Sequence, residues 1–224
     1  MNKFGKTQYF YKQKSKQMKW KFLTLVSIIF ILSSTVFGQQ QGSVSASRKA
    51  VLKNQLDYRY KGGFYSLERK FNKMIIYPDF ARANCIMGIV VVSLVVDCER
   101  NLKQIKMKTA LGYGTNEEIT KFFQSTSGEW NKCEDDKYSR FEIPIQFFIE
   151  GTETNMEDAL FVCTGEMPGH TCNDDNYYLK KAEKSLEKEN GKKALKYLTL
   201  LLRRDPYNVT YQDMRTQALA LENE

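Results

Sequence analysis

The stretch Gly88–Asp97 reads GIVVVSLVVD, and nearly all of its side chains are β-branched or apolar. Such a run predicts a strand that is central in its sheet or buried on both faces. The polar tetrapeptide Cys98–Asn101 follows and predicts a tight turn. Leu102–Thr109 then alternates imperfectly between apolar residues and lysines, as in a strand with one exposed face. The sequence therefore predicts a β-hairpin at the centre of the fold.

Two helices and a third strand flank this hairpin. Apolar residues fall at helical spacing from Phe64, and that helix should stop near Tyr77-Pro78 because the residue before proline avoids the helical conformation. Thr115 is the expected N-cap of a second helix. Arg140–Ile149 reads as the last strand, and Pro144 within it has no N–H to donate, which indicates an edge or a bulge. The order α-β-β-α-β predicts the α+β fold class, with a three-stranded antiparallel sheet and helices on one face.

The rest of the chain predicts a small helical unit after an irregular connector. Thr152–Asn173 is interpreted as irregular. Asp175–Leu202 has the pattern of a helical hairpin that breaks at Asn190-Gly191, and Tyr211–Glu222 reads as a third helix. The acidic pair Asp174-Asp175 is expected in a solvated loop, where it can also cap the first of these helices.

The first 38 residues have the features of an export signal. Lys19-Trp20-Lys21 is a basic segment, Phe22–Phe37 is uncharged and mostly apolar, and Gly38 is a small residue before a polar stretch. The apolar run is shorter than the roughly 20 residues of a membrane-spanning helix, which favours cleavage over an uncleaved inner-membrane anchor. Translation from Met18 would give a compact signal peptide. These features predict a protein of the periplasm or cell envelope.

Most of the formal charge of +8 lies in these first 38 residues. Residues 1–38 carry seven lysines and no acid, which leaves +1 for the rest of the chain. A nearly neutral body lacks the basic patch that nucleic-acid binding needs. His170 is the single histidine, no Cys-x-x-Cys spacing occurs, and no group of residues matches a nucleophilic triad. We therefore expect no catalytic activity, no metal site and no cofactor.

Five cysteines in an exported chain predict disulfides, with at least one thiol left over. Cys98 follows the first strand and Cys133 precedes the last one, so antiparallel strands would bring the two to the same end of the sheet. Cys163 and Cys172 would close a local loop. This assignment leaves Cys85 as the odd thiol, buried and inert.

Several short motifs stand at characteristic separations in the middle of the chain: Gly62-Gly63, Tyr77-Pro78, Gly88 at the start of the β-branched strand, Trp130 and Pro144. Together they resemble the C-terminal domain of the TonB energy-transducer family, in its short Bacteroidetes form. The turn Glu99–Asn101 departs from the family pattern because it lacks the usual glycine. Asn131–Cys133 departs too, because it replaces the Pro-Gly that usually follows the tryptophan.

In that family the last strand accepts an extended receptor peptide by strand addition, which implies a binding edge here. The residues that the resemblance assigns to this edge are Arg140, Phe141, Glu142, Ile143, Ile145, Gln146, Phe147 and Phe148. The alternative is a strand that packs on the core and is covered by Thr152–Cys172. Tyr77-Pro78 and Trp130 are functional in some family members, but here a helix stop and a core aromatic are the favoured interpretation.

Asp175–Pro206 resembles one tetratricopeptide repeat, with Ala182 and Ala194 at the small positions of its two helices. A single repeat is below the usual minimum of about three, so it must pack on the preceding domain or on another chain. The predicted organisation is a signal peptide or uncleaved anchor (1–38), a flexible leader (39–60), a TonB C-terminal-like domain (61–151), a Cys-containing connector (152–174) and a tetratricopeptide-like segment (175–224). Within the flexible leader, Arg48–Tyr60 reads as a short helix or an extended lead-in.

These features predict an exported protein–protein interaction module that binds an extended peptide or another envelope protein by strand addition; a homodimer is compatible with them. The alternative is a membrane-anchored TonB-type component of transport through an outer-membrane receptor. Residues 39–60 contain no proline and extend to at most about 75 Å, which does not cross a periplasm. The missing proline-rich spacer favours the interaction module.

Overall fold

The computed structural model describes residues 37–133, 139–155 and 157–222. Residues 1–36 of the predicted signal peptide (1–38) lie outside these ranges. The chain divides into two units, Met1–Ser45 and Ala46–Glu224, and the sheet and its core belong to the second unit. No helix within the described ranges combines the length and apolarity needed to cross a bilayer.

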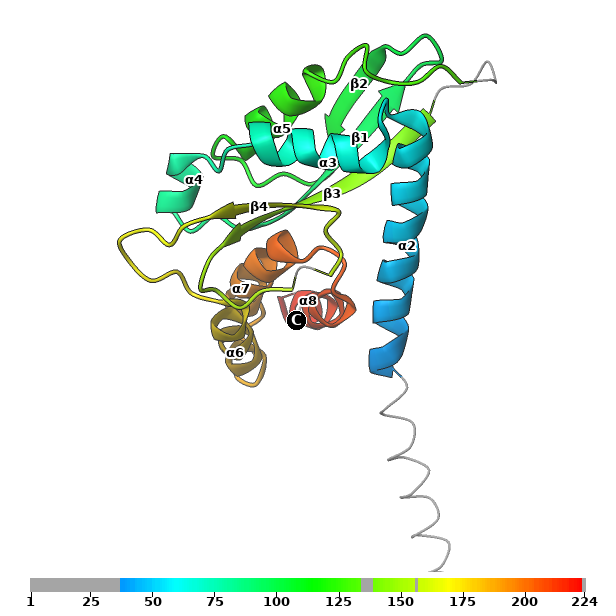
Figure 1. Cartoon of the computed structure of the whole chain (residues 1–224). Helices are drawn as coiled ribbons and strands as arrows, with labels where there is room; N and C mark the ends of the chain where they lie inside the picture. Colours follow the sequence, from blue (N-terminus) through cyan, green and yellow to red (C-terminus); the bar gives the residue numbers. More distant parts are fainter. Residues whose placement is uncertain (1–36, 134–138, 156, 223–224) are drawn as a thin grey trace, which may run out of the picture. The chain divides into compact units, whose positions relative to one another are not determined.

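A four-stranded sheet forms the centre of this α+β unit (Figure 1). β1 (Gly88–Val96) pairs antiparallel with β2 (Leu102–Met107) on one side and with β3 (Ser139–Ile149) on the other. The central strand and its hairpin are therefore confirmed. The predicted number of three strands is wrong, because β4 (Phe161–Gly165) adds to β3 in parallel and gives the order β2-β1-β3-β4.

β4 lies inside the connector that was expected to be irregular. Its burial alternates: Phe161, Cys163 and Gly165 face the core, whereas Val162 and Thr164 are exposed. Alternation of buried and exposed residues is typical of a half-buried strand. Here it extends over only five residues, which is too short to distinguish the strand from the surrounding polar loop. β4 is stabilised by pairing with β3, and the local sequence of β4 does not show this pairing.

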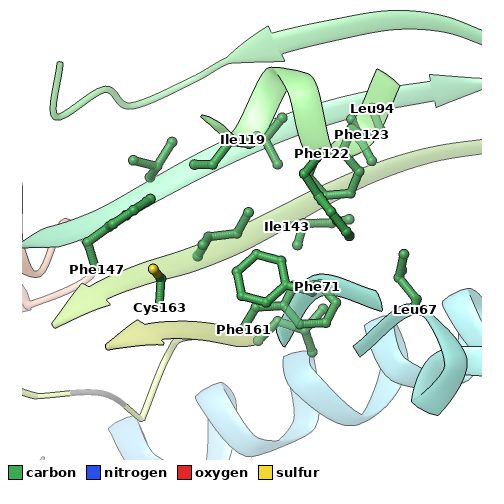
Figure 2. Close-up of a cluster of buried hydrophobic side chains, with 14 of the residues drawn as sticks. Leu67, Phe71, Leu94, Ile119, Phe122, Phe123, Ile143, Phe147, Phe161 and Cys163 are labelled. Carbon is green, nitrogen blue, oxygen red and sulfur yellow. The ribbon is translucent and has the colours of Figure 1, made fainter. Parts of the chain in front are cut away.

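One face of the sheet carries the main hydrophobic core, under α3 (Gly63–Met74) and α5 (Thr115–Gln124). Figure 2 shows Phe71 of α3 between Phe122 of α5 and Phe161 of β4. The Phe71 ring meets Phe122 edge-on at 5.2 Å and stacks on Phe161 at 4.8 Å between centroids. The predicted helices are thus confirmed, although Gly114 and not Thr115 is the N-cap of α5. A short helix, α4 (Asp79–Ala83), follows the Tyr77-Pro78 stop.

The segment predicted to be a flexible leader is helical in the structure, where α2 spans Phe37–Arg59. Within the second unit, Leu52, Leu56 and Tyr60 recur every four residues and are buried in the main core. Asp57 fixes the exit of the helix, since its Oδ1 accepts the N–H of Phe64 at 2.9 Å. A short helix was one of the two interpretations of Arg48–Tyr60, and the structure agrees with it. The flexible leader is wrong because α2 buries an apolar face, while Val51 and Tyr58 of the same helix are exposed.

The C-terminal helices α6 (Asp175–Leu186), α7 (Gly191–Arg204) and α8 (Val209–Glu222) form the predicted helical unit, with a small core of their own. Asp174 caps α6 by accepting the N–H of Tyr177 at 2.7 Å. The helical unit packs on the sheet at the start of β1, where a Cβ added to Gly88 would lie 2.5 Å from the carbonyl oxygen of Arg203. The helical unit thus packs on the preceding domain, which is one of the two packing partners expected for it.

The cysteines form two disulfides, one of them as predicted. Cys98 and Cys133 are bonded, with Cα atoms 4.7 Å apart. The second predicted pair is wrong, because Cys85 bonds Cys172 (Cα–Cα 5.5 Å) and Cys163 is the buried free thiol. The alternation of β4 turns Cys163 into the core, away from the loop that holds Cys172. Burial raises the pKa of Cys163 to about 12, so this thiol is inert at neutral pH.

Candidate binding surfaces

The predicted binding edge on β3 is largely covered. β3 lies between β1 and β4, and the β4 ladder occupies Ile145–Ile149. The prediction that Ile145, Gln146, Phe147 and Phe148 form an open edge is therefore wrong. Arg140–Ile143 lie outside the β4 ladder, but the side chains of Phe141 and Ile143 are buried in the core. The alternative interpretation, a strand covered by the segment that follows it, describes this strand.

Pro144 marks where this covering begins. It lies opposite Val91, whose N–H donates to Thr109 Oγ1 and whose carbonyl accepts from the Lys108 N–H, both on the β2 side. Pro144 and Val91 therefore form a non-hydrogen-bonded pair of the β1–β3 ladder, and the ring nitrogen of Pro144 faces β4. Pairing with β4 starts at the next residue, Ile145, after Leu160 N–H donates to the Pro144 carbonyl at 2.8 Å. The missing N–H of Pro144 thus costs the sheet no hydrogen bond.

The other motif residues have structural roles. Tyr77 Oη donates to the Ile86 carbonyl at 2.6 Å, and its ring meets Phe147 edge-on at 5.3 Å. Trp130 is buried, stacks on Phe141 at 5.5 Å and donates from Nε1 to Thr126 Oγ1 at 3.2 Å. The favoured interpretation of both aromatics as helix-stop and core residues agrees with these contacts.

The outer edge of β2 is open along the described residues. Because Lys108 N–H bonds to Val91, the alternation of backbone direction turns Lys106 and Gln104 toward β1 as well. Ile105 and Met107 then direct their N–H and C=O groups away from the sheet. No backbone hydrogen bond joins these two residues to anything beyond the sheet in the part of the chain that the structure describes. An extended segment can pair with them.

A groove continues from the end of β2. It has a volume of ≈ 630 Å³ and lies between the start of the sheet and the helices α7 and α8. Ile89 and Thr109 line it from the sheet side, and Leu202, Arg203, Gln212 and Arg215 line it from the helices. Thr109 follows Met107 by two residues, so a strand added to β2 would approach this groove at one end.

The edge and the groove share an excess of positive charge. Lys103 and Lys108 are paired, with Asp97 at 3.0 Å and Glu142 at 3.2 Å. Lys106, Arg203 and Arg215 have no acidic partner among the described residues. The net charge of +1 outside the leader concealed this patch, because net charge counts residues and takes no account of where folding gathers them.

The outer edge of β4 is the competing open edge. The Gly165 carbonyl accepts the Glu150 N–H at 2.9 Å, so Phe161, Cys163 and Gly165 turn their backbones toward β3. Val162 and Thr164 turn theirs outward. The groove and the cations that line it adjoin the β2 side of the sheet instead. β2 therefore offers the more developed binding surface.

A cysteine–histidine cluster lies elsewhere in the unit. His170 was expected to have no functional partner, but its Nε2 lies 3.5 Å from Sγ of Cys85. The ligand atoms of Cys85, His170 and Cys172 all lie within 4.8 Å of one another. These residues are far apart in the sequence, and the incorrect pairing of Cys163 with Cys172 concealed the cluster.

Comparison of the chain with family models, curated proteins and solved structures gave no match. The α+β class rests on the described sheet and helices. Similarity to the TonB C-terminal domain stays a prediction that rests on the motif residues. Function must therefore be argued from the surfaces themselves.

Proposed function

We propose that this chain is an exported protein-binding module that takes an extended, acidic peptide onto the outer edge of β2. The observation that carries the proposal is the continuity of this open edge with a groove lined by Arg203 and Arg215, which have no acidic partner within the described ranges. Main-chain pairing to Ile105 and Met107 would supply affinity, and the side chains beside them would supply specificity. The two disulfides accord with an oxidising compartment such as the periplasm or cell envelope.

The two faces of β2 define the pattern of the peptide. Leu102, Ile105 and Met107 are partly buried against the main core, whereas Lys106 is exposed on the opposite face. A strand added to β2 would extend both faces of the sheet, because its side chains alternate. The preferred partner thus alternates apolar and acidic residues, with the acids toward Lys106, Arg203 and Arg215.

Because β4 covers much of β3, the proposed binding edge is β2 and not the β3 edge that the resemblance to TonB implies. The proposed mode of recognition, strand addition, is the same. The helical form of α2 also bears on the transport alternative. A helix of 23 residues is about 35 Å long at 1.5 Å per residue, which is shorter than the extended reach of the same segment. This shorter reach favours the binding module over a transducer that spans a periplasm.

Charge reversal should weaken binding of an acidic strand. The probes are two synthetic octapeptides, one alternating glutamate and valine and one alternating lysine and valine, measured by fluorescence anisotropy. We expect the chain to prefer the glutamate peptide, and Lys106→Glu combined with Arg215→Glu to weaken its binding by about tenfold, since surface charge contacts contribute up to about 1 kcal/mol each.

Lys184→Glu on α6 is the matched control, because this exposed lysine lies outside the groove lining. It should leave the affinity for the glutamate peptide unchanged. Added salt should weaken binding to the unmodified chain more than to the double variant. Equal affinity for both peptides, or equal losses in the control and the double variant, would contradict the proposal.

A further inference from the structure

The Cys85–Cys172 disulfide lies beside the single histidine of the chain. Cys85 follows α4, and His170 and Cys172 belong to the stretch between β4 and α6. Two sulfur atoms and one imidazole nitrogen meet here, and all three ligand atoms lie within 4.8 Å. Of the common divalent cations, zinc is the one that favours thiolate and imidazole ligands.

The distances fit a tetrahedral zinc centre once the disulfide opens. With Zn–S of about 2.3 Å and Zn–N of about 2.0–2.1 Å, a sulfur and a nitrogen ligand stand about 3.6 Å apart. Cys85 Sγ and His170 Nε2 are already 3.5 Å apart. The two sulfur ligands would stand about 3.8 Å apart. Their Cα atoms are 5.5 Å apart, so rotation of the side chains can supply that separation without a large backbone shift.

The cluster is also accessible. His170 is exposed, Cys85 is partly buried and Cys172 is buried, so the site has one open side and one closed side. Three protein ligands leave the fourth tetrahedral position to water.

We propose that Cys85, His170 and Cys172 form a redox-gated site for a thiophilic divalent cation of the zinc class. A dithiol reductant delivers two electrons and two protons to the disulfide and becomes a disulfide itself. The cation then displaces the two thiol protons to solvent and binds both thiolates and the imidazole. In the oxidised chain the sulfurs bond each other, so disulfide and metal exclude one another. Either state fastens the stretch before α6 to the stretch before β1.

The test uses the full chain, oxidised or reduced with dithiothreitol that is then removed without oxygen. Zinc uptake is measured directly, and cobalt is used as a spectroscopic probe of thiolate ligation. We expect the reduced chain to bind one zinc ion through this site and the oxidised chain to bind none there. His170→Ala should weaken uptake at least about tenfold, since even loss of an outer-shell partner costs that much.

Two double variants separate this site from the other cysteines. Cys85→Ser with Cys172→Ser should abolish uptake, whereas Cys98→Ser with Cys133→Ser should retain it. If reduction loosens the fold, zinc should restore the near-ultraviolet circular dichroism, because metal binding couples to folding. Reduced chain that takes up no more zinc than the first double variant, unchanged affinity in His170→Ala, or failure of zinc to restore a loosened fold would each overturn the proposal.

Discussion

Replacing Arg204 with leucine should lower the free energy of unfolding by about 3–5 kcal/mol, which is the range for breaking a buried ion pair by removing one partner. Arg204 donates from Nη1 to Asp175 Oδ1 at 2.8 Å and from Nη2 to the Asn173 carbonyl at 3.0 Å. The two side chains of the pair are only 6% and 12% exposed. Leucine would leave the Asp175 carboxylate buried opposite an apolar group.

The Arg204–Asp175 pair connects segments that lie far apart in the sequence. Arg204 ends α7, Asp175 begins α6, and Asp175 Oδ2 also accepts the Thr154 hydroxyl at 2.6 Å from the β3–β4 connection. Loss of Arg204 should therefore loosen the helical hairpin and its attachment to the sheet together. Asp175 was expected in a solvated loop, and its burial corrects that expectation.

Arg203→Leu is the matched control in a denaturant titration. Arg203 is the adjacent residue but is exposed and has no ion pair among the described residues. Its replacement should change stability by no more than about 0.5 kcal/mol. Combining Arg204→Leu with Asp175→Asn should recover part of the loss, because no charge is then left unpaired. Similar losses for both arginines would show that the pair does not hold the hairpin.

Replacing Gly88 with alanine should lower the free energy of unfolding by about 2–6 kcal/mol. Gly88 has φ +141°, a conformation that costs other residues about 1–3 kcal/mol. The added Cβ would also lie 2.5 Å from the Arg203 carbonyl oxygen and 2.7 Å from the Arg204 Cα. Both neighbours are backbone atoms that cannot rotate away, so α7 would have to move, and overpacking of this kind costs about 1–3 kcal/mol more.

Gly112→Ala separates the two contributions. Gly112 has φ +73°, but apart from its chain neighbours no atom of the described residues lies within 4 Å of the added Cβ. Alanine there should therefore lower the free energy of unfolding by about 1 kcal/mol, from the backbone alone. Thermal or denaturant unfolding of both variants gives the comparison. Equal losses would mean that α7 does not rest on the start of β1.

The sequence predicted most of what local pattern controls. Gly88–Asp97 and Arg140–Ile149 are long and apolar enough to be identified as strands, and the Cys98–Cys133 bond followed from their antiparallel order. β4 was not predicted, because an alternating pattern of five residues is a weak signal and the strand is stabilised by pairing with β3. For α2 a short helix was only one of two interpretations of Arg48–Tyr60, because its apolar signal is limited to Leu52, Leu56 and Tyr60.

The candidate site was harder to predict, because it depends on tertiary placement. Pro144 was expected at a sheet edge or a bulge, but β3 is an internal strand that pairs with β1 through Pro144 without a register shift. The sequence does not show that β4 pairs from the next residue onward. Arg203 and Arg215 belong to different helices, and they line the same groove as Thr109 only once the helical unit packs on the sheet. A count of charges along the sequence cannot show that folding brings these positive side chains together.

Amide hydrogen exchange on the outer edge of β2 tests the central claim most directly. In the free chain the Ile105 and Met107 amides should exchange faster than those of Lys106 and Gln104, which bond to β1. Saturation with the glutamate–valine peptide should slow exchange at Ile105 and Met107 and leave Val162 and Thr164 of β4 unchanged. Protection that appears at β4 instead, or at neither edge, would contradict strand addition at β2.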